Sequence, residues 1–156
     1  MRTQAMTKVF IGCGAGFSGD RFDAAVPVVA TLAKLPGPRF LIYEVLAERT
    51  LAIAQRLKRE NPDHGYSPFL DHYLPLVLAD CRRHSIRIVT NMGSANPLGA
   101  AKHVLELASE LGIRGLKVAA VTGDDLLATM PESQIREQPT MEGIKLSDRP
   151  MLAANV

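Results

Sequence analysis

The sequence predicts an α/β fold in which helices cover both faces of a mainly parallel β-sheet, a three-layer, Rossmann-like arrangement. Four short apolar segments have the pattern of buried strands, at residues 8–12, 39–45, 86–91 and 116–123. A helix-forming segment separates each strand from the next. Because right-handed crossovers align such strands in parallel, their carboxyl ends are predicted to meet at one edge of the sheet, where ligands bind in folds of this class.

The crossover segments carry signals for where their helices begin and end. In the first, residues 23–35, Pro27 is compatible only with a helix that starts late or bends. In the second, a helix is predicted over residues 46–60 and a loop over 61–68, and the helix that then begins at Ser67 is expected to be kinked or split at Pro75. In the third, Asn96 begins a helix that Gly112 ends in the left-handed conformation.

One α/β domain is predicted over residues 7–130. A chain of 156 residues is long enough to bury a core of its own. Residues 131–156 are polar and interrupted by proline, without clear periodicity until the last few. We expect this segment to be a flap, a linker or the start of a further, truncated region.

Charge and composition exclude several classes of function. The formal net charge is +2 and the basic residues are scattered, which argues against a nucleic-acid partner. No apolar run approaches the roughly 20 residues of a membrane span, and no apolar signal core precedes the first strand. The two cysteines form no disulfide framework, which suits a reducing compartment. We therefore expect a cytoplasmic protein.

A glycine-rich loop follows the first strand. Gly14, Gly16 and Gly19 have the spacing of a dinucleotide-binding turn. Asp20 argues against this interpretation, because it places a carboxylate where the pyrophosphate would lie. Glu44 also lies about 25 residues beyond Gly19, which is long for the acid that binds the ribose. NAD and FAD are disfavoured, and a nucleotide-binding domain is kept as the third hypothesis.

Four carboxylates come from the ends of the predicted strands, at Asp20, Glu44, Asp124 and Asp125. If they converge, they can bind a divalent cation or shift one another's pKa for proton transfer. Asp20, Glu44 and Asp124 are the candidate metal ligands. The alternative is that Asp20 and Asp124 only cap helices.

Two asparagines flank the loop after the third strand. Asn91 closes a buried strand, where its amide can hold a carbonyl or an oxyanion. Asn96 begins the following helix, where a cap is the expected role.

Five segments in this order resemble the N-terminal part of the acyclic terpene utilisation (AtuA-like) family. They run from about Val9 to Leu127 and read "IGCGAGFSGDR", "LAERT", "GYSPFL", "IRIVTNMGSANPLGAA" and "LKVAAVTGDDLL". The family pattern G-F-x-G-D-R does not require glycine at position 14, which further weakens the dinucleotide interpretation. The resemblance implies a soluble bacterial protein encoded with enzymes that degrade citronellol and geraniol through CoA thioesters.

The leading hypothesis is therefore a site for a small carboxylated or CoA-linked acyl substrate, with lyase, hydratase or hydrolase chemistry. Asp20, Glu44 and Asp124 are the candidate acids, bases or metal ligands, and Asn91 is the candidate that orients a carbonyl. Arg21 is expected to pair with a substrate anion. The full set of candidate binding residues is Gly16, Phe17, Ser18, Gly19, Arg21, Gly93, Asn96, Gly123 and Asp125.

Two local departures from the family pattern lie at the predicted edge. The family usually has an aromatic residue where this chain has Val45, and a second glycine where it has Ser94. Relatives also continue into a further region, so we expect a naturally short form or a fragment. A truncated sheet exposes an apolar flank. We therefore expect a homo-oligomer or a complementing partner chain, and a non-catalytic binding or assembly module is the second hypothesis.

Overall fold

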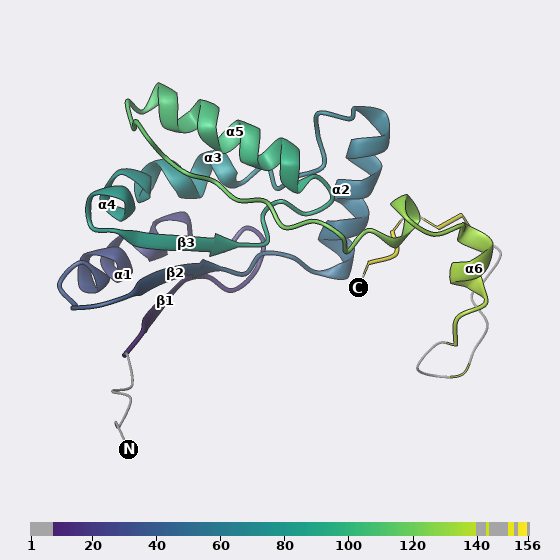
Figure 1. The fold of residues 1–156 in the computed structure, drawn as a ribbon, viewed down its shortest axis with the longest axis horizontal. Helices are drawn as coiled ribbons and strands as arrows, with labels where there is room; N and C mark the ends of the chain where they lie inside the picture. The colour runs from purple at the N-terminus through teal and green to yellow at the C-terminus, as the bar shows by residue number, and fades with distance from the viewer. Residues whose placement is uncertain (1–7, 140–142, 144–149, 152, 156) are drawn as a thin grey trace, which may run out of the picture.

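Three parallel strands form the centre of the computed structural model, which describes residues 8–139, 143, 150–151 and 153–155 (Figure 1). They are β1 (Phe10–Ala15), β2 (Arg39–Tyr43) and β3 (Ile86–Thr90), and they lie side by side in the order β1-β2-β3. Leu41 at the middle of β2 pairs with Gly12 on one side and Ile88 on the other. The predicted α/β class with a parallel sheet is confirmed.

The helices follow the start and stop signals of the sequence. The chain forms η1 (Phe22–Ala24), α1 (Ala25–Leu32), α2 (Glu48–Glu60), α3 (Leu70–Tyr73), η2 (Leu74–Leu76), α4 (Leu78–Arg83), α5 (Pro97–Glu110), η3 (Leu126–Ala128) and α6 (Glu132–Arg136). Pro27 lies in the first turn of the late-starting α1, and Pro75 lies in η2, which separates α3 from α4. Among the described residues, no helix combines the length and apolar character needed to span a membrane.

The hydrophobic core lies on one face of the sheet. Leu41 and Tyr43 of β2 are buried there against side chains of α1, α3, α4 and α5. Burial raises the pKa of the Cys81 thiol of α4 to about 11. On the opposite face, the side chains of Ile11 and Val89 are 69% and 51% exposed.

We predicted helices on both faces, and in the described residues the core-forming helices gather on the Leu41 face. Strand order explains this arrangement. The strands advance in one direction across the sheet, from β1 through β2 to β3. Right-handed crossovers that all step in the same direction place their helices on the same face.

Residues 116–123 were predicted to form a fourth strand of the sheet, and this prediction is wrong, because the segment does not pair with β3. After α5 the chain turns back and runs in the same direction as β3 (Figure 1). Among the described residues, however, the backbone of residues 116–123 makes no hydrogen bond to any neighbour, and the sheet ends at β3. The apolar β-branched pattern specifies an extended backbone, but a ladder also requires a neighbouring strand within hydrogen-bonding distance.

The described part of the C-terminal segment returns to the domain. Asp125 and Asn155 form an isolated antiparallel bridge, and the Leu126 amide donates a 2.8 Å hydrogen bond to the Ala154 carbonyl. Between these points α6 buries Ile135. The predicted boundary near residue 130 stays a prediction, and residues 140–142, 144–149, 152 and 156 lie outside the described residues.

Candidate functional site

The loop after β1 is closed by its own aspartate. Asp20 Oδ2 accepts a hydrogen bond from the Gly16 amide (3.1 Å), and Oδ1 accepts one from the Arg21 amide (2.7 Å). The Tyr73 hydroxyl donates to the Asp20 carbonyl (2.8 Å), which ties the loop to α3. Asp20 therefore uses both carboxylate oxygens to hold the backbone of residues 16–21 in place.

The three glycines of the pattern have different surroundings, and Gly14 lies within β1. A Cβ at Gly14 would lie 2.6 Å from Cε1 of Tyr43, so this glycine allows close packing in the core. A Cβ at Gly16 would meet no atom within 4 Å. Gly19 has a φ of +83°, a conformation that favours glycine.

Of the other candidate residues in this loop, Phe17 is exposed and Arg21 is paired with a nearby carboxylate. Phe17 is 61% exposed, and Ser18 is partly buried. Arg21 forms a bidentate contact with Asp23, which raises the pKa of the arginine and lowers that of the aspartate. Arg21 is therefore already engaged with a carboxylate of the same chain.

Glu44 and Asn91 form a direct pair across the carboxyl ends of β2 and β3. Asn91 Nδ2 donates to Glu44 Oε1 (2.8 Å), and the Leu46 amide donates to the same oxygen (3.1 Å). Asn91 Oδ1 accepts from the amide of the buried Val45 (2.8 Å). One asparagine thus orients the carboxylate and binds the backbone that follows β2.

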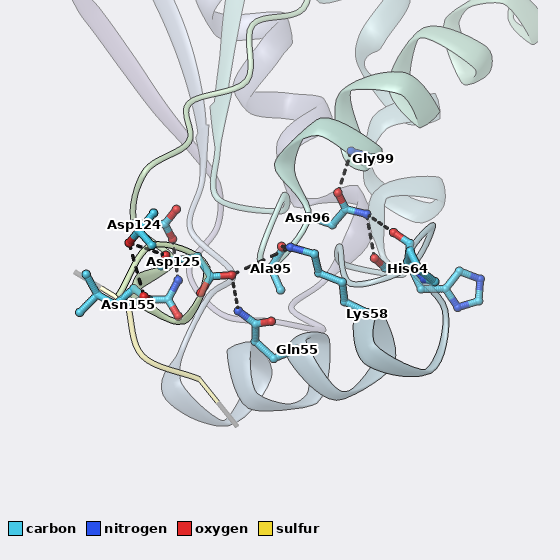
Figure 2. Close-up of polar contacts among 12 residues, drawn as sticks. Gln55, Lys58, His64, Ala95, Asn96, Gly99, Asp124, Asp125 and Asn155 are labelled. Carbon is cyan, nitrogen blue, oxygen red and sulfur yellow. Dashed lines mark hydrogen bonds and ion pairs between the residues drawn. The ribbon is translucent and has the colours of Figure 1, made fainter. Parts of the chain in front are cut away.

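The loop after β3 is a tight turn that leads into α5. A Cβ at Gly93 would lie 2.9 Å from the Cα of Pro97, so the turn leaves no room for a side chain. Asn96 caps α5, because its Oδ1 accepts from the Gly99 amide (3.0 Å). Its Nδ2 donates to the carbonyls of Pro62 and His64, as Figure 2 shows for His64.

Ser94 lies in the left-handed region with a φ of +46°, at the position where the family pattern has glycine. This conformation costs a non-glycine residue about 1 kcal/mol. A glycine here would avoid that cost, but its greater freedom in the unfolded chain would offset part of the gain. We expect Ser94→Gly to raise the free energy of unfolding by about 0.5 kcal/mol. Urea denaturation checks this, with Ser94→Ala as the matched control. An equal gain from alanine would contradict the conformational explanation.

The two aspartates after residue 123 lie in a polar network that reaches α2 (Figure 2). Asp124 Oδ2 accepts from Asn155 Nδ2 (2.8 Å). Asp125 Oδ2 accepts from Gln55 Nε2 (3.1 Å) and lies 4.0 Å from the ammonium of Lys58. The network holds the end of the extended segment against α2.

Lys58 also connects this network to the loop after β3. Its ammonium donates to the Ala95 carbonyl (2.7 Å), beside the turn formed by residues 91–96. Gly123, immediately before the two aspartates, is exposed and has a φ of +119°. The loops that follow β3 and the extended segment are therefore joined through one side chain of α2.

A cavity of about 1020 Å³ gathers part of the predicted site. Asn91, Gly93 and Asp124 contribute to its lining, and Glu44 is joined to it through Asn91. The loop of residues 16–21 does not line this cavity. Within the described ranges, no group of three His, Cys, Asp or Glu residues is arranged to hold a metal ion, so Asp20, Glu44 and Asp124 do not form one ligand set.

Three residues of the polar network, Gln55, Lys58 and Asn155, were not among the residues predicted from the sequence. Gln55 is buried although it is polar. Gln55 and Lys58 are three residues apart on a helix and so share a face. This spacing is the sequence feature that could have indicated a shared polar contact. No local sequence pattern indicated Asn155, because its contact with Asp124 joins residues that are 31 positions apart.

A family model described as "Acyclic terpene utilisation family protein AtuA" matches residues 9–156. The matched range contains the glycine loop, the Glu44–Asn91 pair and both aspartates after residue 123. No curated protein and no solved structure matches the chain significantly. The resemblance seen in five sequence segments is thus confirmed, and the chain belongs to the acyclic terpene utilisation family AtuA.

Proposed function

We propose that the chain acts in acyclic terpene utilisation by binding a small carboxylated or CoA-linked acyl compound at the carboxyl edge of its sheet. Family membership supports the metabolic setting. The observation that carries the proposal is the Glu44–Asn91 pair, which lies where two parallel strands end and beside the cavity.

Glu44 has the arrangement of a positioned base. Its Oε1 is held by the Asn91 side chain and the Leu46 amide, whereas Oε2 has no hydrogen-bond partner among the described residues. The residue is exposed to solvent, so a ligand can reach it. A carboxylate with one oxygen fixed and the other accessible can accept a proton from a bound compound.

Asn91 supplies the complementary group. Its amide nitrogen has two hydrogens, and only one is used by Glu44. The second can donate to the carbonyl oxygen of an acyl group. When Glu44 accepts a proton from the carbon next to that carbonyl, the C–H electron pair forms an enolate, and the Asn91 donor stabilises its oxygen. Proton transfer of this kind is the first step expected of a lyase or hydratase acting on a thioester.

The geometry of the glycine loop argues against a dinucleotide ligand. The amides of Gly16 and Arg21 are directed to the Asp20 carboxylate. A pyrophosphate would need such backbone amides and would meet the negative charge of Asp20. The loop is therefore poorly suited to binding phosphate.

Deuterium exchange tests the proposal. We expect the protein to exchange the protons next to the thioester carbonyl of isovaleryl-CoA in D₂O, as followed by NMR. Glu44→Gln should slow exchange by about a hundredfold or more, because it removes the base but keeps the shape of the side chain. Glu48→Gln, at an exposed position at the start of α2, is the matched control and should exchange like the unmodified chain.

Isothermal titration separates binding from chemistry. Binding of isovaleryl-CoA that is stronger than that of free CoA would support an acyl site. If the folded protein neither binds the thioester nor exchanges its protons, the proposal is wrong. If exchange persists unchanged in Glu44→Gln, the assignment of the base is wrong.

A further inference from the structure

We infer that the cavity between β3 and residues 116–121 is a slot for an extended strand of a partner chain. We use "the slot" for this cavity of about 1020 Å³, whose lining includes residues 86–91 and 115–122. The entering strand would lie beside β3 as the next strand of the parallel sheet. The inference does not depend on the chemistry proposed for Glu44.

The slot has two walls, β3 on one side and residues 116–121 on the other, and both present backbone donors and acceptors without partners among the described residues. β3 is the last strand of the sheet, and no backbone hydrogen bond of the described residues crosses from it to the extended segment. Residues 116–121 make no backbone hydrogen bond to any described residue. Extended backbones offer alternating donors and acceptors, and a strand edge left in this state is a template for another strand.

Side chains of the core helices line the slot between these walls. Leu74, Leu78 and Val104 contribute from η2, α4 and α5. On the extended segment, the side chain of Val121 is 87% exposed. An apolar strand would cover this surface and would continue the hydrogen-bond ladder of β1, β2 and β3 as its fourth strand.

Polypeptide fits the slot better than an acyl chain does. An acyl chain could cover the apolar lining, but it would leave the donors and acceptors of both walls without partners. A strand satisfies both requirements, because its two edges carry the same groups as the walls.

The charged residues that line the slot indicate which side chains a partner strand should carry. The lining contains the cations Arg82 and Lys117, the residue Arg87, whose guanidinium lies over the Phe40 ring, and, beyond the carboxyl end of the extended segment, the single carboxylate Asp124. The slot is therefore net positive. An apolar partner strand that carries acidic residues has the complementary charge.

A capped heptapeptide of alternating valine and threonine with glutamate at both ends is the probe. We expect saturable binding by isothermal titration and new strand signal in the infrared amide band. The same peptide with alternate backbone amides N-methylated is the control and should bind about tenfold more weakly or worse, because the methyl groups block the ladder along one of its two edges. Equal binding of the two peptides would overturn the inference.

Two proline variants locate the peptide. Neighbouring amides of an extended segment point to opposite sides, so only one of Ala119→Pro and Ala120→Pro removes a donor that faces the slot. We expect one variant to weaken peptide binding about tenfold and the other to leave it unchanged. Both should fold normally, since neither amide is bonded within the described residues. Loss of binding in both variants, or in neither, would contradict the strand model.

Glu44→Gln separates this inference from the proposed function. It should retain peptide affinity while losing deuterium exchange. If the folded, unmodified chain binds isovaleryl-CoA but not the peptide, the slot is not a strand site and the inference fails.

Discussion

Replacing Asn91 with alanine is expected to lower the free energy of unfolding by about 2–3 kcal/mol, measured by urea denaturation. The substitution removes the acceptor of the Val45 amide and the side-chain donor to Glu44. Val45 is buried, so its amide would lose its partner without gaining water. An unsatisfied buried donor costs more than an average hydrogen bond contributes, which is why the expected effect is large.

Two variants identify the cause of the Asn91 effect. Asn61→Ala removes an exposed asparagine whose Oδ1 accepts from the Asp63 amide, and it should cost no more than about 0.5–1 kcal/mol. Asn91→Asp keeps an acceptor for Val45 but places a second carboxylate beside Glu44. It should be destabilising at pH 7 and recover stability as the pH falls, because protonation removes the repulsion. Equal effects of Asn61→Ala and Asn91→Ala would contradict the bridging role.

Asn91→Ala should also abolish deuterium exchange in protein that remains folded. Glu44 would lose the group that fixes Oε1, and the enolate oxygen would lose its donor. Exchange in the folded variant at the rate of the unmodified chain would remove Asn91 from the proposed site without affecting its structural role.

Local signals in the sequence predicted most of the fold. Residues 39–45 have an apolar pattern that is followed by helix formers, and the first five of them form β2 (Arg39–Tyr43) in the centre of the sheet. Pro75 predicted the split between α3 and α4 because proline removes a backbone donor at a defined position. The pairing of residues 116–123 was not predictable, since it depends on the distance to β3 and not on the segment itself.

Topology predicted which residues would lie at the carboxyl edge, but not their partners. Glu44 and Asn91 each end a predicted strand, and the parallel order places them next to each other. Their hydrogen bond joins residues 47 positions apart, and no local pattern encodes such a contact. For the same reason the links from Asp125 to Gln55 and from Lys58 to the Ala95 carbonyl appear only in the folded chain.

Gly14→Ala is expected to lower the free energy of unfolding by about 1–3 kcal/mol. The added Cβ would lie 2.6 Å from Tyr43 Cε1 and 3.1 Å from the Cβ of Ala25. Tyr43 is buried in contact with the ring of Tyr73, so its own ring has little freedom to move aside. Strain from an overpacked core is therefore the expected cause.

Gly16→Ala is the matched control and should change stability by less than about 0.5 kcal/mol, because a Cβ there meets no atom within 4 Å. The pair of variants distinguishes the two interpretations of the glycine pattern. In a dinucleotide-binding turn, the second glycine is needed so that a pyrophosphate can approach the backbone. In this structure Gly14 is needed by the core and Gly16 is open to solvent. Thermal unfolding of both variants in buffer checks this, and a destabilised Gly16→Ala beside an unaffected Gly14→Ala would contradict the packing of β1 against Tyr43.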